Sequence, residues 1–222
     1  MNSSRSVVVL GGSGLVGGEL LTLLLREPTV SSVTALVRSA RNLPADPKLH
    51  IREIDFTQLE RYADAFEADQ LFCALGTTMR QAGSRERFRA VDHEYPVMAA
   101  RLGRDRGATH YLLVSAFGAN PSSRIFYNRV KGETERDISA LDFTSLTIAR
   151  PSFLLGRRHE TRLGERLAAV IGRLAPATVR PISAKDVAAA LTLAARYVRL
   201  GKHILTSREM RDASLRLSNQ SP

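Results

Sequence analysis

The stretch VVVLGGSGLVGGELLTLLL, residues 7–25, decides the fold. It opens on four consecutive apolar residues, a pattern typical of a strand that is buried on both faces of a sheet. Gly11, Gly14 and Gly17 follow at intervals of three, and the apolar stretch after them is typical of a buried helix. Glycines between a buried strand and a helix predict a tight turn that brings backbone N–H groups close to a phosphate.

The same alternation of strand and helix continues along the chain. Strand-like runs are VSSVTALVR, LHIREID, ADQLFCALG, HYLLVSA and DFTSLTIAR, and helix-like stretches lie near 84–106 and 123–140. After Pro151 the pattern predicts helices near 160–174 and 183–199, with a short apolar HIL behind them. We therefore predict an α/β fold, a Rossmann-type doubly wound parallel sheet with a small helical C-terminal appendage. Residues 1–222 are expected to form a single domain, in which 151–222 contribute the substrate side.

Composition limits the classes of protein that remain. The chain has 222 residues, of which 44% are hydrophobic and 24% charged, as in an ordinary globular domain. No apolar run approaches the roughly 20 residues of a membrane span, and the N-terminus lacks the pattern of a signal peptide. The single cysteine, Cys73, excludes an internal disulfide and is expected to be a small apolar residue of a buried strand. These features predict a cytoplasmic protein without a metal site.

The net charge of +10 raises the question of nucleic acid. The 32 basic residues are spread along the chain, and no block of five or six like charges appears. We interpret them as a solvated, arginine-rich surface whose positive field would attract an anionic cofactor or substrate. Non-specific binding of nucleic acid remains the alternative to this interpretation.

The ends of the predicted strands indicate a dinucleotide. Gly11 would permit the tight turn, Gly14 the approach of a pyrophosphate, and Gly17 close packing of helix on sheet. Arg38 follows the second strand, where an NAD site would carry a carboxylate, and Arg41 lies nearby. Because a guanidinium pairs well with a 2′-phosphate, we predict NADP(H). The alternative is that Arg38 merely ends the strand.

Two further strand ends would complete the cofactor site. Asp55, after the third strand, is expected near the adenine. The loop ALGTT, with Leu75, Gly76 and Thr77, follows the fourth strand and is expected beside the nicotinamide ribose.

Ser115, Tyr127 and Lys131 are the candidate catalytic residues. Ser115 ends the fifth strand, at the sheet edge where such folds bind ligands. Tyr127 and Lys131 are four residues apart and would share a helix face, where an ammonium lowers the pKa of a phenol towards the range of a general acid. Ser115 would bind a substrate carbonyl, and Lys131 would also hold the nicotinamide ribose. The alternative for Tyr127 is a buried core aromatic.

These motifs together resemble the short-chain dehydrogenase/reductase superfamily in its atypical, extended-like branch. FCALGTT, FRAVDHEY, SAFGA, YNRVKGETE and ARPSFLLGRRHETRLGE narrow the resemblance to the Tat-interacting oxidoreductase-like family, also labelled nucleoside-diphosphate-sugar epimerase-like. The resemblance runs from about residue 7 to residue 170. It implies NADPH binding, with Ser13, Gly14, Leu15 and Val16 on the pyrophosphate, Arg38 on the 2′-phosphate, and Leu154 and Arg162 along the cofactor.

One residue departs from the superfamily pattern. Members often carry an asparagine, part of a proton relay, at the position that we assign to Asp92. An ionised carboxylate lacks the donor of an amide, so Asp92 either changes the relay or holds the local backbone. The neighbouring His93 is expected to be a surface or hydrogen-bonded histidine.

Three functions are therefore open. The first is an NADPH-dependent oxidoreductase that reduces a small carbonyl compound, with Tyr127 as proton donor. The second is an NADP(H)-binding regulatory or interaction protein with little or no turnover. The third, binding of nucleic acid, rests on charge alone. We expect a monomer or a homodimer, without a specific nucleic-acid partner and without a membrane.

Overall fold

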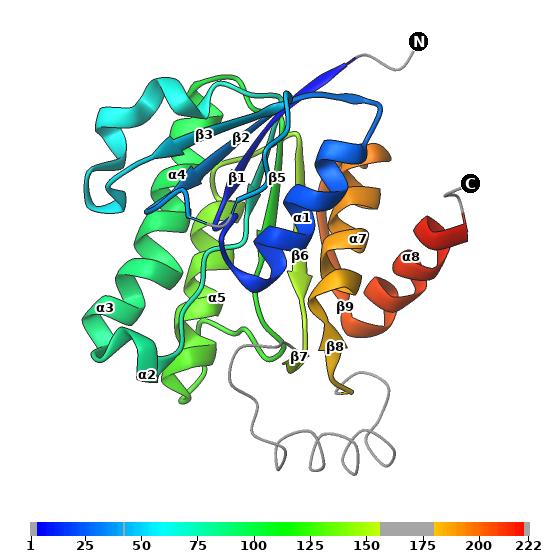
Figure 1. The fold of residues 1–222 in the computed structure, drawn as a ribbon. Coiled ribbons are helices and arrows are strands. Elements are labelled where there is room, and N and C mark those ends of the chain that lie inside the picture. The colour runs from blue at the N-terminus through cyan, green and yellow to red at the C-terminus, as the bar shows by residue number, and fades with distance from the viewer. Residues whose placement is uncertain (1–3, 42, 156–179, 220–222) are drawn as a thin grey trace.

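Seven parallel strands form the central sheet of the protein (Figure 1). The computed structural model describes residues 4–41, 43–155 and 180–219. The spatial order is β3-β2-β1-β4-β5-β6-β9, and the order reverses direction between β1 and β4. The strands are β1 (Arg5–Leu10), β2 (Val30–Val37), β3 (Leu49–Glu53), β4 (Gln70–Cys73), β5 (His110–Val114), β6 (Ser145–Arg150) and β9 (Gly201–Thr206). The predicted Rossmann-type fold class is thus confirmed.

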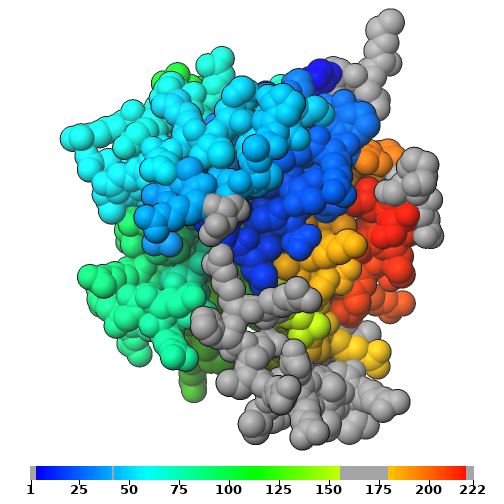
Figure 2. All heavy atoms as spheres, in the orientation of Figure 1, coloured from blue at the N-terminus to red at the C-terminus, as the bar shows by residue number. Residues whose placement is uncertain are grey.

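Helices cover both faces of this sheet. On one face lie α1 (Leu15–Arg26) and α7 (Ala184–Arg196), and α8 (Ser207–Asn219) packs against α7. On the other face lie the 3₁₀ segment η1 (Phe56–Phe66), α4 (Tyr95–Asp105) and α5 (Phe126–Ser139). Figure 2 shows α8 on the outer side of α7. The remaining elements are α2 (Met79–Ala82), α3 (Arg85–Arg89), the π-helical turn η2 (Ala90–Glu94), and a second sheet of β7 (Leu154–Leu155) and β8 (Ile182–Ser183).

The apolar run of β1 supplies both halves of the core. Val7 and Val9 point to the layer of α1 and α7, whereas Val8 and Leu10 point to the layer of η1 and α4. All four side chains are at most 1% exposed. An unbroken apolar run is therefore what a central parallel strand requires, because side chains alternate between two buried faces.

The C-terminal part contains helices, as predicted, and also a strand. The short HIL lies in β9, which pairs in parallel with β6 from Gly201 opposite Ser145 to Thr206 opposite Arg150. β9 is an edge strand with alternating partial exposure, so it lacks the long apolar run that marks the inner strands. The predicted helix near 160–174 lies outside the described residues. Among the described helices, none is long and apolar enough to cross a membrane.

We predict that His110 makes the fold sensitive to acid. Its ring is 1% exposed, and Nε2 lies 2.9 Å from Thr147 Oγ1. Burial, with smaller contributions from the charges of Arg5 and His203, lowers the pKa of His110 to about 4. An unfolded histidine titrates near pKa ~6.5, so this contribution to stability is present above that pH and is lost as the pH falls towards 4. The loss should reach roughly 3 kcal/mol, at about 1.4 kcal/mol per pH unit.

Denaturant unfolding between pH 7 and pH 4 would test this expectation. His110→Gln should flatten the pH dependence of the unfolding free energy, whereas His50→Gln, at an exposed histidine of β3, should leave it unchanged. An equally steep loss in His110→Gln would show that other groups cause it.

Candidate functional site

A cavity of about 750 Å³ lies at the carboxyl ends of β1, β2, β3 and β4. This is the edge at which doubly wound sheets bind ligands, next to the point where the strand order reverses. Eight of the predicted cofactor residues line the cavity: Gly11, Ser13, Gly14, Arg38, Asp55, Leu75, Gly76 and Thr77. These residues come from four separate strand ends, and the fold brings them to one hollow.

The glycine loop has the geometry that a phosphate cradle requires. Gly11 has φ +82°, and a Cβ atom there would lie 2.6 Å from the carbonyl oxygen of Ala74. A Cβ atom on Gly17 would lie 2.0 Å from the carbonyl oxygen of Gly11. The N–H of Gly14 donates to that same oxygen at 2.9 Å, and α1 begins at the next residue. The first N–H groups of α1 have no intrahelical acceptor, so they are available to an anion.

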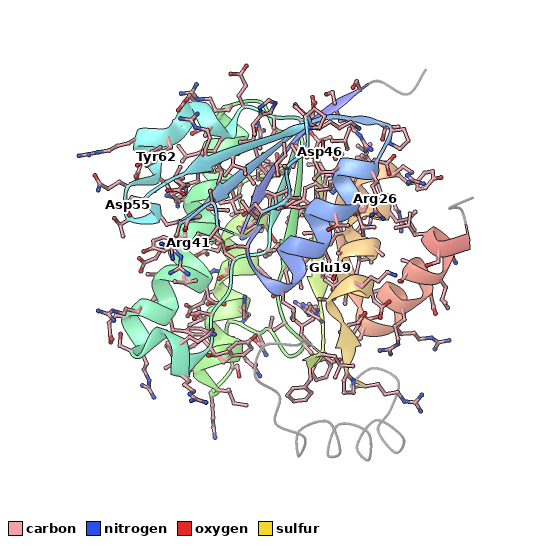
Figure 3. The ribbon with its side chains drawn as sticks, in the orientation of Figure 1. Glu19, Arg26, Arg41, Asp46, Asp55 and Tyr62 are labelled. Atoms are coloured by element: carbon pink, nitrogen blue, oxygen red, sulfur yellow. The ribbon has the colours of Figure 1, made fainter. Side chains whose placement is uncertain are left out.

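Two arginines give the cavity a positive character. Arg38 lines it from the end of β2 and Arg87 from α3. Within the described part of the chain, neither forms an ion pair with a carboxylate. Arg41 is not among the lining residues, although Figure 3 shows it on the side where β2 and β3 end.

Asp55 is the acidic residue of the cavity, and its carboxylate is engaged locally. It accepts hydrogen bonds from Thr57 N at 2.9 Å, from Thr57 Oγ1 at 2.7 Å and from Gln58 Nε2 at 3.0 Å. These bonds, those from Thr57 first, lower the pKa of Asp55, so it stays ionised as the N-cap of η1. Asp55 therefore shapes the cavity wall through its bonds to Thr57 and Gln58.

Other predicted cofactor residues do not line this cavity. Leu15 and Val16 begin α1, where Val16 is buried in the core and Leu15 is exposed. Leu154 lies in β7 and is 36% exposed. Tyr127 and Lys131 lie on α5, outside the lining. Arg162 lies outside the described residues.

Lys131 is held behind the cavity wall by Asp92. The Lys131 Nζ atom lies 2.8 Å from Asp92 Oδ1, and these side chains are 7% and 1% exposed. Asp92 Oδ2 accepts the N–H of Thr77 at 2.9 Å, so the same carboxylate fixes a lining residue of the loop after β4. Asp92 thus connects a wall of the cavity to the candidate catalytic helix.

Tyr127 is 37% exposed, and its ring packs against Phe88 with 5.6 Å between the centroids. The sequence predicts that Lys131 lowers the pKa of this phenol. In the structure the pKa is raised, because burial and the negative charge of Asp92 outweigh the positive charge of Lys131. The pKa of Lys131 itself is raised: burial lowers it, but the attraction of Asp92, with a smaller one from Tyr127, prevails.

Ser115 is not among the lining residues, and its predicted contact with a substrate carbonyl stays a prediction. Ser115 is 5% exposed, and its hydroxyl donates to Glu135 Oε1 at 2.5 Å. Glu135 also accepts from Arg150, whose Nε lies 3.0 Å from Oε1. Glu135 is eight residues beyond Tyr127 on α5, about 12 Å along the helix axis. In this structure the hydroxyl of Ser115 is therefore hydrogen-bonded within the fold.

Two minor predictions concern residues beside the site. His93 Nε2 lies 2.8 Å from Asp137 Oδ2, as expected of a hydrogen-bonded histidine. Cys73 is fully buried in β4, and burial raises the pKa of its thiol. Both residues thus belong to the packing of the fold.

Sequence reasoning missed several lining residues. Gln81 and Arg87 lie in the short helices after β4, and Val91 and Tyr95 lie in η2 and the start of α4. Tyr95 packs against Phe56, with 5.8 Å between ring centroids, and so joins α4 to the loop after β3. No local motif marks these positions, because their place depends on how α3 and α4 pack over β4.

Comparisons with known proteins identify the family of this chain. The profile of a family described as NAD(P)H-binding matches residues 11–196. Rat protein HTATIP2 is 38% identical over 168 residues, which are 74% of this chain and 69% of that protein. Mitochondrial protein FMP52 of Candida albicans is 33% identical over 193 residues, 82% of this chain and 84% of that protein. The chain belongs to the NAD(P)H-binding HTATIP2/FMP52 family.

Solved structures place this family in a wider fold class. WbmH of Bordetella bronchiseptica, in complex with NAD⁺, superimposes with a TM-score of 0.72 at 14% identity, over 92% of this chain and 76% of that one. UDP-glucose 4-epimerase of Thermotoga maritima gives 0.69 at 12% identity, over 98% and 84%. These likenesses show the fold. The predicted resemblance to the HTATIP2-like family is confirmed, whereas a cytoplasmic location stays a prediction, since the FMP52 relatives are named as mitochondrial.

We predict that substitution by alanine at two neighbouring glycines of α1 changes the free energy of unfolding in opposite directions. A methyl group at Gly17 would collide with the carbonyl of Gly11, whereas one at Gly18 would lie 3.7 Å from the oxygen of Gly12, an ordinary contact. Gly17→Ala should lower the unfolding free energy by 2 kcal/mol or more, on the order of an overpacked core. Gly18→Ala should raise it by up to about 1 kcal/mol, because alanine favours a helix. Denaturant unfolding of both variants tests the pair, and equal stabilities would contradict the helix–loop contact.

Proposed function

We propose that this protein is an NADPH-dependent oxidoreductase that reduces a small carbonyl compound, with Tyr127 as the proton donor. The observation that carries the proposal is the cavity itself. It combines a glycine loop, the start of α1 and an arginine without a carboxylate partner among the described residues, and it adjoins a buried lysine one turn from a tyrosine. Membership of an NAD(P)H-binding family supports a nicotinamide cofactor.

The charges around the cavity favour NADPH over NADH. The position after β2 holds Arg38, and the acidic residue of the cavity, Asp55, follows β3 and caps η1. A guanidinium at that position would pair with a 2′-phosphate, whereas a carboxylate would be needed for a free ribose hydroxyl. Arg87 adds a second positive charge to the same hollow.

The residues of α5 would perform the acid–base part of the reaction. Bound NADPH would supply the hydride. Tyr127 would donate its phenolic proton to the carbonyl oxygen as the alcohol forms. Its raised pKa makes it a weaker acid than the sequence predicts. Because Ser115 donates to Glu135, we assign the contact with the oxygen to Tyr127.

The bond from Ser115 to Glu135 favours one alternative. With the serine proton engaged inside the fold, the carbonyl oxygen lacks a second donor from this residue. A protein that binds NADPH and changes its affinity for a partner, with little or no turnover, would need no such donor. The two functions differ in one measurable respect, which is whether bound NADPH is consumed in the presence of a carbonyl compound.

We predict that Arg38 determines the preference for NADPH. Arg38→Glu should weaken NADPH binding about 10- to 100-fold, as expected for the loss of a charge-assisted bond, and should leave NADH binding equal or stronger. Arg41→Glu is the matched control, because it makes the same charge change close in sequence but outside the lining. Nicotinamide fluorescence would follow both titrations. Equal weakening of NADPH and NADH by both variants would exclude a specific contact.

We predict that Tyr127 is required for turnover and not for binding. Tyr127→Phe should lower kcat about 10²- to 10⁴-fold, as expected for the loss of a general acid, with the Kd for NADPH nearly unchanged. The assay would be NADPH oxidation against a panel of aldehydes, ketones and quinones. Tyr197→Phe, at an exposed tyrosine after α7, is the control. Binding without turnover of any compound in the wild type would favour the regulatory function.

A further inference from the structure

Arg87 is one of three arginines in the short helix α3, and the helix directs them to two different sides. Arg85 and Arg89 are four residues apart and so share a face. The guanidinium carbon of Arg85 lies 5.2 Å from the ring centroid of Phe126 on α5. Arg89 pairs with Glu133, also on α5. Arg87 lies about 200° from Arg85 around the helix, at 3.6 residues per turn, and it lines the cavity instead.

The backbone of Arg87 is fixed, whereas its guanidinium is uncommitted. The backbone N–H donates to Ser84 Oγ at 3.2 Å, which caps the start of α3. The side chain is exposed, and it forms no ion pair within the described part of the chain. A guanidinium that faces a hollow without a carboxylate partner is well suited to an anionic ligand.

Arg87 lies at the β4 end of the cavity, away from the end of β3. The elements α3, η2 and α4 form one continuous helical stretch, because the residues at both junctions have right-handed helical backbone. Arg87 precedes Tyr95 by eight residues on this stretch, which is roughly 12 Å along the axis. The ring of Tyr95 packs against Phe56 just beyond β3, with 5.8 Å between centroids. The opposite end of the stretch, with Arg87, is joined to β4 through α2.

The order of the strands places the glycine loop between Arg38 and Arg87. In the sheet, β1 lies between β2 and β4, and neighbouring strands are about 4.8 Å apart. Arg38 follows β2, and Arg87 belongs to the segment that follows β4. The loop after β1 contributes Gly11, Ser13 and Gly14 to the same cavity. A phosphate held by this loop would therefore have Arg38 on one side and Arg87 on the other.

We propose that Arg87 binds the pyrophosphate of the dinucleotide from the β4 side, while Arg38 binds the 2′-phosphate from the β2 side. In folds of this type the pyrophosphate is held by backbone N–H groups at the start of a helix. Arg87 adds a charge-assisted contact to these. Because NADPH and NADH share the pyrophosphate, Arg87 raises the affinity for both and leaves the preference between them to Arg38. The proposal rests on the proposed function only in that a nicotinamide dinucleotide occupies this cavity.

The test is a set of titrations that separates the two kinds of phosphate. Nicotinamide fluorescence gives the Kd of NADPH and of NADH. Displacement of NADPH gives the Kd of ADP, which carries a diphosphate without a 2′-phosphate, and of 2′-AMP, which carries only the 2′-phosphate. Arg87→Gln should weaken NADPH, NADH and ADP each about 10-fold, as expected for the loss of a hydrogen bond to a charged group, and should leave 2′-AMP unchanged. Arg38→Glu should weaken NADPH and 2′-AMP and spare ADP.

Arg85→Gln is the matched control. It removes the same charge from the same helix, on the face that is turned to Phe126, so the Kd of all four ligands should stay at the wild-type value. The control also measures how much of any effect comes from the general positive field of the protein. Because the side chains of Arg85 and Arg87 are both exposed, neither substitution should change the free energy of unfolding, which denaturant unfolding checks.

Equal Kd values in the wild type, Arg87→Gln and Arg85→Gln would overturn the proposal. Weakened NADPH and 2′-AMP with unchanged NADH and ADP in Arg87→Gln would place Arg87 on the 2′-phosphate, and would overturn it as well. Failure of the proposed function looks different. NADPH that binds but is never consumed would remove the oxidoreductase and leave the role of Arg87 intact, whereas a wild type that binds neither NADPH, NADH nor ADP would overturn both.

Discussion

Helix α1 can begin directly at the end of β1 because no side chain separates Gly17 from the carbonyl oxygen of Gly11. A Cβ atom there would lie 2.0 Å from that oxygen, far inside van der Waals contact. This approach places the first turn of α1 directly after the glycine loop that lines the cavity, and a helix N-terminus favours an anion. It also lets the apolar face of α1 pack on β1 and α7. The glycine loop and the core layer between the sheet and these two helices therefore depend on the same contact.

Buried charges are the second constraint on this fold. Asp92 and Lys131 are both almost fully buried, and so is Glu135, which pairs with Arg150. An isolated buried charge is strongly unfavourable, so each of these groups requires its partner and further hydrogen bonds. Both pairs include a residue of α5, which is thereby fixed in rotation against the sheet. That rotation determines which way Tyr127 faces.

The two pairs give the polar residues of α5 different partners. Tyr127, Lys131 and Glu135 are spaced four residues apart on α5, so they share one face of the helix. Tyr127 is partly exposed, whereas Lys131 and Glu135 are buried. Lys131 meets Asp92 from η2, and Glu135 meets Ser115 from β5. Ser115 is consequently bonded to a residue of α5 that lies one turn beyond Lys131 and two turns beyond Tyr127. One face of α5 thus carries the partly exposed candidate proton donor and two buried residues that pair with other elements.

Local patterns in the sequence were sufficient for much of the architecture. The unbroken apolar run of β1 and the spacing of Gly11, Gly14 and Gly17 predicted the strand, the turn and the helix, because each depends on residues adjacent in the chain. The sequence also predicted that Arg38 lies at the cavity, because it follows β2 and the carboxyl ends of parallel strands meet at one edge of the sheet. β9 was missed as a strand, because an edge strand of alternating exposure carries only a short apolar signal.

The amino-acid sequence by itself therefore determined the fold class, the glycine loop and the strand ends that surround the cavity. The tertiary structure alone decided which partners the buried polar groups take: Asp92 for Lys131, and Glu135 for Ser115. It also decided that Arg87 faces the cavity. The physical reason is that these contacts join elements far apart in the chain. Their distances depend on how helices rotate and pack on the sheet, which no local pattern encodes.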